Sequence, residues 1–355
     1  MEILTVIAPN KNLSPIMLNM IEHFSKDFEK IEMVYSIYDS ENFKNKKLLF
    51  ILELNESGFD IPMIQFASDL QYADSDSLYK STAALLVHSL NEMGTKRAAQ
   101  DIIFWANNLG CSFIGQPVIE ATSSLKNFLT WQKSMDIPLD DICFKLCYNL
   151  GRRLKDYNSN VPYITVPKIT VLYSSPHAVS NTLSLWHMIS KHLDGFKINE
   201  ILIENGKVLD CKGCSYKLCL HYGKQNSCFY GGFMTDSVLP AVENADGIVW
   251  LCPNYNDSLS ANLTAVINRL TVLYHKMNFY NKNMYGIIVS GNSGSDSVAK
   301  QLIGSLNINK GFKLPYHALI TAVANDPNAI YSIDGIEKKA EAFSLNMRNH
   351  FLKYK

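Results

Sequence analysis

KITVLYSSPHAVSNT, residues 168–182, is the stretch around which the rest of the chain is organised. Its apolar, β-branched run at 169–173 suits a buried parallel strand, and a polar loop follows. The loop ends where LSLWHMISKHL begins an amphipathic helix, so free backbone N–H groups and the positive end of the helix dipole converge there. This arrangement favours an anion such as phosphate. The alternative is an ordinary strand-to-helix turn in which Ser180 or Asn181 only caps the helix.

Size and composition indicate a folded protein with two domains. The chain has 355 residues, 47% of them hydrophobic, which is enough for two sizeable cores. Lysine plus arginine equals aspartate plus glutamate at 33 each, without a long basic run, so nucleic acid is not an expected partner. No signal sequence pattern is present, and no apolar run approaches the roughly 20 residues that span a bilayer. We therefore expect a cytoplasmic protein with no membrane partner.

Strand and helix patterns alternate along the chain and predict an α/β fold. In the first half, residues 3–8, 47–54 and 82–89 are expected strands, and residues 15–24, 96–110, 124–135 and 140–154 are expected helices. In the second half the expected strands are 169–173, 198–203, 247–252, 285–290 and 316–321. The helices expected between and after them are 181–193, 235–244, 258–276, 296–305 and 335–351. Five strands with crossover helices predict a doubly wound parallel sheet.

The two halves resemble each other. ILTVIAPNKNLSPIMLNMIEHF is similar to ITVLYSSPHAVSNTLSLWHMISKHL, and ALLVHSLNEMGTKRAAQDI is similar to GIIVSGNSGSDSVAKQLIG. We infer a duplicated domain, 1–157, a polar linker, 158–167, and a second domain, 168–355. The alternative is two unrelated segments that share only strand-then-helix order. Bulky or charged residues replace small ones in the loops of the first half, which predicts that this copy has lost its ligand.

Three loops of the second half are expected at the carboxyl edge of its sheet. The first lies within 174–182, the second is CPNYNDSLS at 252–260, and the third is SGNSGS at 290–295. Tyr255 offers an aromatic face, and the glycines of the third loop allow close approach of backbone to a ligand. Together the loops predict a phosphate-bearing aromatic cofactor.

These segments resemble NADPH-dependent FMN reductases and iron–sulfur flavoproteins. SSPHAVSNT is similar to the family's phosphate loop, usually GSPRxxSNT, and ADGIVWLCPNYNDSLSANLTAVINRL is similar to its flavin-ring segment, including Asn268 and Arg269. The resemblance covers residues 168–306 and implies a flavodoxin-like fold for both domains, the second with five strands in flavodoxin-type order. The loops of the first half match the family poorly, so the resemblance implies no binding site in that half.

The resemblance also implies a set of FMN-binding residues. The phosphate would be surrounded by Ser174, His177, Ser180, Asn181 and Thr182. The ring and ribityl chain would be lined by Pro253, Asn254, Tyr255 and Asn256, and the other edge would be closed by Ser290, Gly291, Asn292 and Gly294. His177 stands where the family has arginine, and an imidazole is mostly neutral at physiological pH. Weaker phosphate binding, or loss of flavin, is the alternative.

Four cysteines, Cys211, Cys214, Cys219 and Cys228, follow a C-x2-C-x4-C-x8-C pattern. Such thiolates can hold a [4Fe–4S] cluster or a tetrahedral zinc ion, and free thiols are the third alternative. Iron–sulfur flavoproteins have a tighter C-x2-C-x2-C-x5-C arrangement. Lys212, Lys217 and Lys224 would favour lowered thiol pKa values.

The function expected from these features is an NAD(P)H-dependent FMN oxidoreductase. Hydride would pass from the nicotinamide to the flavin, and electrons would then leave to a small-molecule or redox-protein acceptor. No catalytic residue is expected, because the cofactor carries the chemistry. The alternatives are an iron–sulfur electron carrier and a non-catalytic scaffold without cofactor. For assembly, we expect either a pseudo-dimer within one chain or a homodimer.

Overall fold

The computed structural model describes residues 2–157, 164–175, 179–225 and 227–352. The chain divides into two compact units, unit 1 (Met1–Val161) and unit 2 (Pro162–Lys355). The division falls within the expected linker at 158–167, of which residues 158–163 lie outside the described residues.

Unit 1 contains a parallel sheet of five strands in the order β2-β1-β3-β4-β5. Its strands are β1 (Ile3–Ile7), β2 (Lys30–Val34), β3 (Lys47–Leu54), β4 (Ser81–Ser89) and β5 (Cys111–Ala121). Its α-helices are α1 (Pro15–Ser25), α2 (Ile61–Ala73), α3 (Thr95–Asn108), α4 (Leu129–Met135) and α5 (Leu139–Lys155). Short 3₁₀ turns are η1 (Ile37–Asp39) and η2 (Lys126–Phe128).

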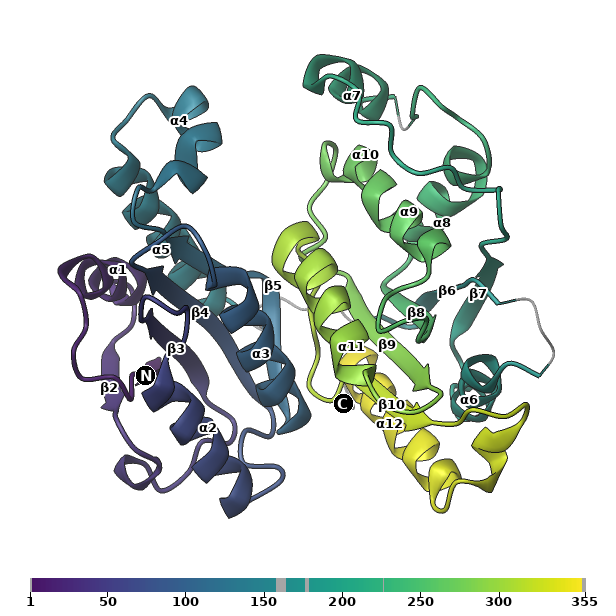
Figure 1. Cartoon of the computed structure of the whole chain (residues 1–355), viewed down its shortest axis with the longest axis horizontal. Coiled ribbons are helices and arrows are strands. Elements are labelled where there is room, and N and C mark those ends of the chain that lie inside the picture. The colour runs from purple at the N-terminus through teal and green to yellow at the C-terminus, as the bar shows by residue number, and fades with distance from the viewer. Residues whose placement is uncertain (1, 158–163, 176–178, 226, 353–355) are drawn as a thin grey trace. The chain divides into compact units, whose positions relative to one another are not determined.

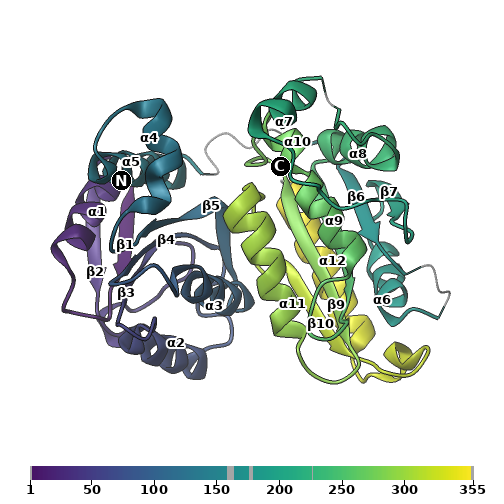
Figure 2. The same ribbon diagram turned by 45° about the horizontal axis from the view of Figure 1, so that its top comes forward.

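Helices cover both faces of the unit 1 sheet, with α1 and α5 side by side on one face and α2 and α3 on the other (Figures 1 and 2). A Cβ added at Gly151 in α5 would lie 1.9 Å from the carbonyl oxygen of Phe24 in α1. Glycine therefore allows these two helices to approach closely over a core that includes Leu49 and Leu86.

Unit 2 repeats this topology with a parallel sheet in the order β10-β9-β8-β6-β7. Its strands are β6 (Lys168–Tyr173), β7 (Lys197–Leu202), β8 (Gly247–Pro253), β9 (Asn283–Ser290) and β10 (Leu319–Val323). Its α-helices are α6 (Asn181–Ser190), α7 (Tyr216–Gly223), α8 (Leu239–Asn244), α9 (Ala261–Arg269), α10 (Thr271–Tyr274), α11 (Ser295–Leu302) and α12 (Ile336–Phe351). Two π-helical segments are η3 (Met234–Val238) and η4 (Ile303–Lys310), and η5 (Ala329–Ser332) is a 3₁₀ turn.

Helices α6 and α12 pack together on one face of the unit 2 sheet, where Ser344 Oγ donates to the carbonyl oxygen of Ile189 at 2.8 Å. Helices α8, α9 and α11 cover the other face (Figure 1). Counted from its own first strand, each unit has the strand order 2-1-3-4-5, which is the flavodoxin order. The predicted fold of two flavodoxin-like doubly wound sheets is confirmed.

The main differences from the predicted elements lie in unit 1, where strands β2 and β5 and helix α2 were not predicted. Strand β2 is largely exposed, so its sequence lacks a buried apolar run. Strand β5 is interrupted by Gly115, Gln116 and Pro117; Gln116 has φ +48°, and the register shifts between Ala83 and Leu85 of the neighbouring strand. A bulge of this kind hides the strand pattern. None of the helices in the described part of the chain combines the length and apolar character that a bilayer crossing requires.

Candidate functional site

The candidate site lies at the carboxyl edge of the unit 2 sheet, where the loops after β6, β8 and β9 meet. In open parallel sheets this edge, at the point where the strand order reverses, is where ligands bind. The predicted FMN-binding residues that the structure describes lie in these three loops or at the strand and helix ends that adjoin them. His177 is the exception that cannot be placed, because it lies outside the described residues.

The first loop is joined to the second by a pair of serines. Ser174 Oγ donates to Ser260 Oγ at 2.9 Å, and Ser260 caps α9 by accepting the N–H of Leu263 at 3.4 Å. Ser180 caps α6 in the same way, accepting the N–H of Leu183 at 3.4 Å. The remaining N–H groups of the first turn of α6 are available to an anion, together with the positive end of the helix dipole.

The side chain of Asn181 is hydrogen-bonded to the loop that follows β10. Its Nδ2 donates to the carbonyl oxygens of Ala324 and Asp326 at 3.0 and 2.9 Å, and its Oδ1 accepts the N–H of Ile330 at 3.2 Å. These bonds use both amide hydrogens and the amide oxygen, so Asn181 positions the start of α6. Its expected role toward a phosphate stays a prediction, as does that of Thr182, which is buried.

The second loop forms a tight turn that presents Tyr255. Asn256 and Asp257 have φ values of +52° and +57°, and Tyr255 and Ser258 exchange backbone hydrogen bonds of 3.3 and 3.1 Å across them. Two positive φ values in succession are characteristic of a type I′ turn. The Tyr255 residue is 52% exposed at this turn, so its ring is accessible to a planar ligand.

Helix α11 fixes this turn in place. The carbonyl oxygen of Asp257 accepts hydrogen bonds from Ser297 Oγ at 3.0 Å and from Gln301 Nε2 at 2.9 Å. Gln301 Oε1 in turn accepts the N–H of Leu259 at 3.1 Å. The turn is therefore held by side chains of the helix that follows the third loop, which makes the second and third loops one unit of structure.

Asn254 connects the second and third loops directly. Its Nδ2 lies 3.1 Å from Asp257 Oδ1, 3.1 Å from Ser290 Oγ and 2.9 Å from the carbonyl oxygen of Ser293. Its Oδ1 is buried and has no hydrogen-bond partner among the described residues. Buried acceptors are normally paired, so this oxygen marks a position that a donor from a ligand would stabilise.

Glycines give the third loop its shape. Gly294 has φ +85°, and an added Cβ would lie 1.8 Å from Asp257 Oδ1 and 3.0 Å from Asn254 Nδ2. A Cβ at Gly291 would lie 2.8 Å from Asn325 Oδ1. Ser290 is buried and its Oγ lies 2.7 Å from Ser295 Oγ, whereas Asn292 Oδ1 accepts the N–H of the adjacent Ser293 at 2.6 Å. Small residues therefore let these loops lie in contact, as the close approach of a ligand to backbone requires.

The charge of the three loops is low. The sequences SSPHAVSNT, PNYNDSLS and SGNSGS contain neither lysine nor arginine, and Asp257 is their one acid. A phosphate there would be held by N–H and hydroxyl groups and by the dipole of α6. The donor set suits a phosphate-bearing aromatic cofactor: hydroxyls and N–H groups at α6, amide groups and an aromatic face at the second loop, and accessible backbone at the third.

The four cysteines form a second feature of unit 2. Cys211, Cys214, Cys219 and Cys228 line one cavity of about 300 Å³, which also has an aromatic wall of Tyr216, Tyr222, Phe229, Tyr230 and His275. Burial raises the pKa of the Cys219 thiol, and the neighbouring Cys211, Cys228 and Cys214 raise it further. Lys310 opposes these effects only in part, so the pKa of Cys219 is raised and not lowered as expected from Lys212, Lys217 and Lys224. Within the described residues, no three His, Cys, Asp or Glu side chains are arranged to hold a metal ion.

Asn268 and Arg269 of the family-like segment hold the base of this cysteine loop. Asn268 Nδ2 donates to Asp210 Oδ1 at 2.8 Å. Arg269, which is 4% exposed, donates to the carbonyl oxygens of Leu209 at 3.4 Å and Gly231 at 3.0 Å. Helix α9 has nine residues, and Ala261, beside the second loop, lies at the opposite end from Arg269, which corresponds to about 12 Å along the helix axis.

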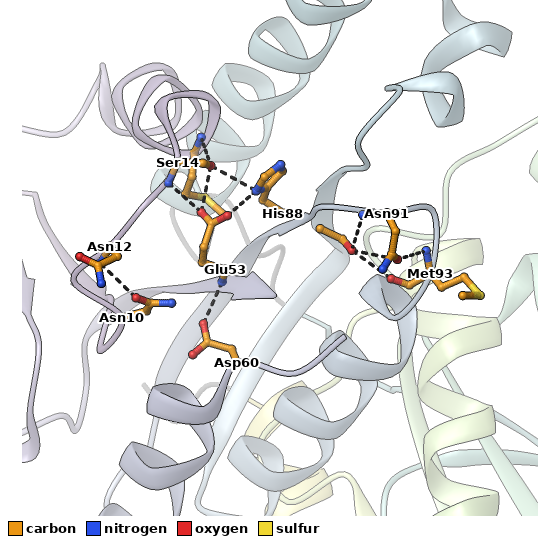
Figure 3. Close-up of polar contacts among 10 residues, drawn as sticks. Asn10, Asn12, Ser14, Glu53, Asp60, His88, Asn91 and Met93 are labelled. Carbon is orange, nitrogen blue, oxygen red and sulfur yellow. Dashed lines mark hydrogen bonds and ion pairs between the residues drawn. The ribbon is translucent and has the colours of Figure 1, made fainter. Parts of the chain in front are cut away.

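Unit 1 has a polar cluster at the corresponding edge that the sequence did not reveal (Figure 3). Glu53 Oε2 accepts hydrogen bonds from Ser14 N and Ser14 Oγ at 3.1 and 3.0 Å, and Glu53 Oε1 contacts His88 Nδ1. His88 Nδ1 also lies 3.2 Å from Ser14 Oγ. The available signal was a polar residue, Glu53 or His88, near the end of each of two buried runs, KLLFILEL and TAALLVHS.

Residues 167–326 match the family model described as NADPH-dependent FMN reductase. The match covers less than half of the chain and lies within unit 2, where it includes all three loops and the cysteine segment. This agrees with the resemblance stated from the sequence. No match was found among curated proteins.

Solved structures similar to this chain include a quinone oxidoreductase and an azoreductase. An NAD(P)H:quinone oxidoreductase from Methanothermobacter marburgensis is 11% identical, with 53% of this chain and 98% of that chain covered and a TM-score of 0.41. An azoreductase from Bacillus anthracis str. Sterne is 11% identical, with 52% and 100% covered and a TM-score of 0.36. At these scores the likeness carries no argument about function, and the assignment of the fold rests on the strand order.

Proposed function

We propose that unit 2 binds FMN and acts as an NAD(P)H-dependent oxidoreductase. The family match over residues 167–326 supports this general activity. The observation that carries the proposal is the linkage of three ligand-type loops at one sheet edge, through Ser174–Ser260 and Asn254–Ser290. When bound, FMN would accept hydride from a nicotinamide and pass electrons to an acceptor, either a small molecule or a redox protein.

The protein's contribution would be binding and orientation. The first turn of α6, with Ser180 as its cap, would hold the phosphate. Tyr255 would offer its ring to the cofactor or to the nicotinamide. Asn254 would hold the edge of the flavin ring through its buried side-chain oxygen Oδ1. Because these groups are already fixed by hydrogen bonds within the loops, little ordering would accompany binding.

The test is FMN binding followed by steady-state turnover. Titration of the purified chain should quench FMN fluorescence, and NADH or NADPH should be oxidised in the presence of FMN and a quinone. Tyr255→Ala should weaken FMN binding, whereas Tyr72→Ala, at a 90% exposed tyrosine of unit 1, should not. A protein that neither binds FMN nor oxidises either nicotinamide contradicts the proposal and favours the non-catalytic scaffold.

A second candidate function is an iron–sulfur electron carrier, and one observation favours it. All four cysteines line the same cavity. The ligands of one cluster must likewise surround a common space. The thiols would have to move to take up metal, because no described set of three is arranged for it. Anaerobic reconstitution with iron and sulfide, followed by analysis of both, tests this function. Cys219→Ser should reduce incorporation and Cys143→Ser, at a buried thiol of unit 1, should not; a chain that takes up neither element contradicts it.

A further inference from the structure

Sheet register shows which residues of the two units correspond. Ile7, the last residue of β1, pairs with Phe50, and Tyr173, the last residue of β6, pairs with Leu251. Three residues further along, Glu53 of unit 1 therefore takes the place of Asn254 of unit 2. The same comparison aligns His88 with Ser290, because Phe50 pairs with Leu85 and Leu251 pairs with Ile287.

Each corresponding pair lies side by side at the end of its sheet. Glu53 is directly opposite His88 in the β3–β4 ladder. In unit 2, Asn254 and Ser290 follow the last pair of the β8–β9 ladder, Pro253 and Val289, and Asn254 Nδ2 donates to Ser290 Oγ at 3.1 Å. Unit 2 thus has the small neutral residues Asn254 and Ser290 at the positions where unit 1 has the carboxylate of Glu53 and the imidazole of His88.

The two pairs have different effects on the helix after the first strand. In unit 2, Asn254 bonds within its own and the third loop, and no carboxylate among the described residues bonds to the start of α6. In unit 1 the side chain of Glu53 reaches the cap of α1, where its Oε2 accepts both the N–H and the hydroxyl of Ser14. A negative charge is most favourable at such a helix start.

We propose that the Glu53 carboxylate is a built-in substitute for a phosphate group at the start of α1, and that it closes unit 1 to phosphate-bearing ligands. A tethered carboxylate loses no translational freedom on binding, so it competes effectively with a free anion. His88 contacts the other carboxylate oxygen and holds the side chain in place. The inference deepens the proposed function, since it assigns the cofactor to unit 2 alone, with one FMN per chain.

Burial acts against the ionised form of Glu53, and the hydrogen bonds outweigh it. Burial alone would raise the pKa of Glu53, but hydrogen bonds from His88 and Ser14 lower it below the ordinary value. Asp60, which caps α2, accepts the backbone N–H of Glu53 at 2.8 Å, and the pKa of Asp60 is raised, mainly by its burial and in smaller part by the Glu53 charge. The carboxylate of Glu53 is therefore the anion that this edge stabilises.

The first test installs the unit 2 pair in unit 1 of the full chain. The double variant Glu53→Asn with His88→Ser should bind about one more equivalent of inorganic phosphate than the wild type, measured by equilibrium dialysis with radiolabelled phosphate. The matched control, Glu22→Asn with His23→Ser on α1, makes the same change in charge away from the edge and should bind no more than the wild type. A folded double variant without the extra equivalent overturns the proposal.

The second test uses the wild type and does not depend on how the variant folds. In protein labelled with ¹³C and ¹⁵N, the Ser14 amide resonance should shift with the same midpoint as the Glu53 carboxyl carbon when the pH is lowered. A Ser14 amide that does not respond to the Glu53 titration overturns the proposal. Neither test uses flavin, so a failure of the proposed function would be recognised separately, by the absence of FMN binding to unit 2.

Discussion

Ser174 Oγ donates to Ser260 Oγ at 2.9 Å, and this bond joins the loop after β6 to the start of α9. Ser174→Ala should weaken FMN binding about five- to tenfold, because a net hydrogen bond contributes about 1 kcal/mol. Ser260→Ala should do the same and also lower the unfolding temperature, because it removes the cap of α9, which is typically worth about 1 kcal/mol.

Fluorescence titration with FMN and thermal unfolding measure these two effects. Ser190→Ala is the matched control, since Ser190 Oγ donates to the carbonyl oxygen of His187, an exposed residue of its own helix α6. Equal FMN affinity in wild type and Ser174→Ala would show that the bond does not position the site.

Gly294 and Gly195 offer a comparison that separates backbone strain from crowding. Both have left-handed backbone, with φ +85° and +86°, but an added Cβ meets Asp257 at Gly294 and nothing within 4 Å at Gly195. Alanine at either position should cost about 1–2 kcal/mol for the backbone conformation. Only Gly294→Ala should also separate the second and third loops and abolish FMN binding. Similar FMN affinities in the two variants would contradict the role of the loop contact.

Local pattern was sufficient to predict most of unit 2. The run at 169–173, the polar loop and the helix after it are adjacent in sequence, and the capping serines Ser180 and Ser260 each stand immediately before a helical period. Right-handed crossovers then placed helices on both faces of the sheet, and the resemblance to the flavin reductases implied the strand order. The three loops could be brought to one edge because parallel strands end on the same side.

Contacts between distant residues could not be predicted in this way. Glu53 and His88 are 35 positions apart, and their pairing depends on the exact register of β3 and β4. Asn181 looks like a phosphate ligand in its motif, yet its amide bonds to backbone more than 140 positions away. The role of Arg269 at the base of the cysteine loop depends likewise on partners 38 and 60 positions distant.

Arg269 should control access to the cysteine cavity. Its buried guanidinium bonds to backbone carbonyls on both sides of the loop, so Arg269→Ala should release the base of the loop and accelerate the reaction of the four thiols with a disulfide reagent. We expect an increase on the order of tenfold, since hydrogen bonds from a charged donor contribute about 1.5–3 kcal/mol. The control is Arg348→Ala, whose exposed guanidinium also bonds to two carbonyl oxygens, of His192 and Asp194. Unchanged thiol reactivity in Arg269→Ala would mean that the loop is held by other contacts.

His350 in α12 should make the chain sensitive to mild acid. Part of this residue is exposed, but both ring nitrogens are shielded from solvent, and the ring packs against Tyr316 with centroids 4.1 Å apart. Burial lowers the pKa of His350 to about 3, and the nearby His317 acts in the same direction, while the backbone of Asn346 opposes them.

The folded state therefore keeps His350 neutral where the unfolded chain would bind a proton. The free energy of unfolding should be highest above pH 6.5 and should decrease as the pH falls toward 3. Between pH 6.5 and 5 most carboxylates stay ionised, so this window reports mainly on histidine. His350→Leu should flatten the dependence of the unfolding temperature on pH there, and His187→Leu, at an exposed histidine of α6, should leave it as in the wild type. If His350→Leu keeps the wild-type slope, another group is responsible for the acid sensitivity.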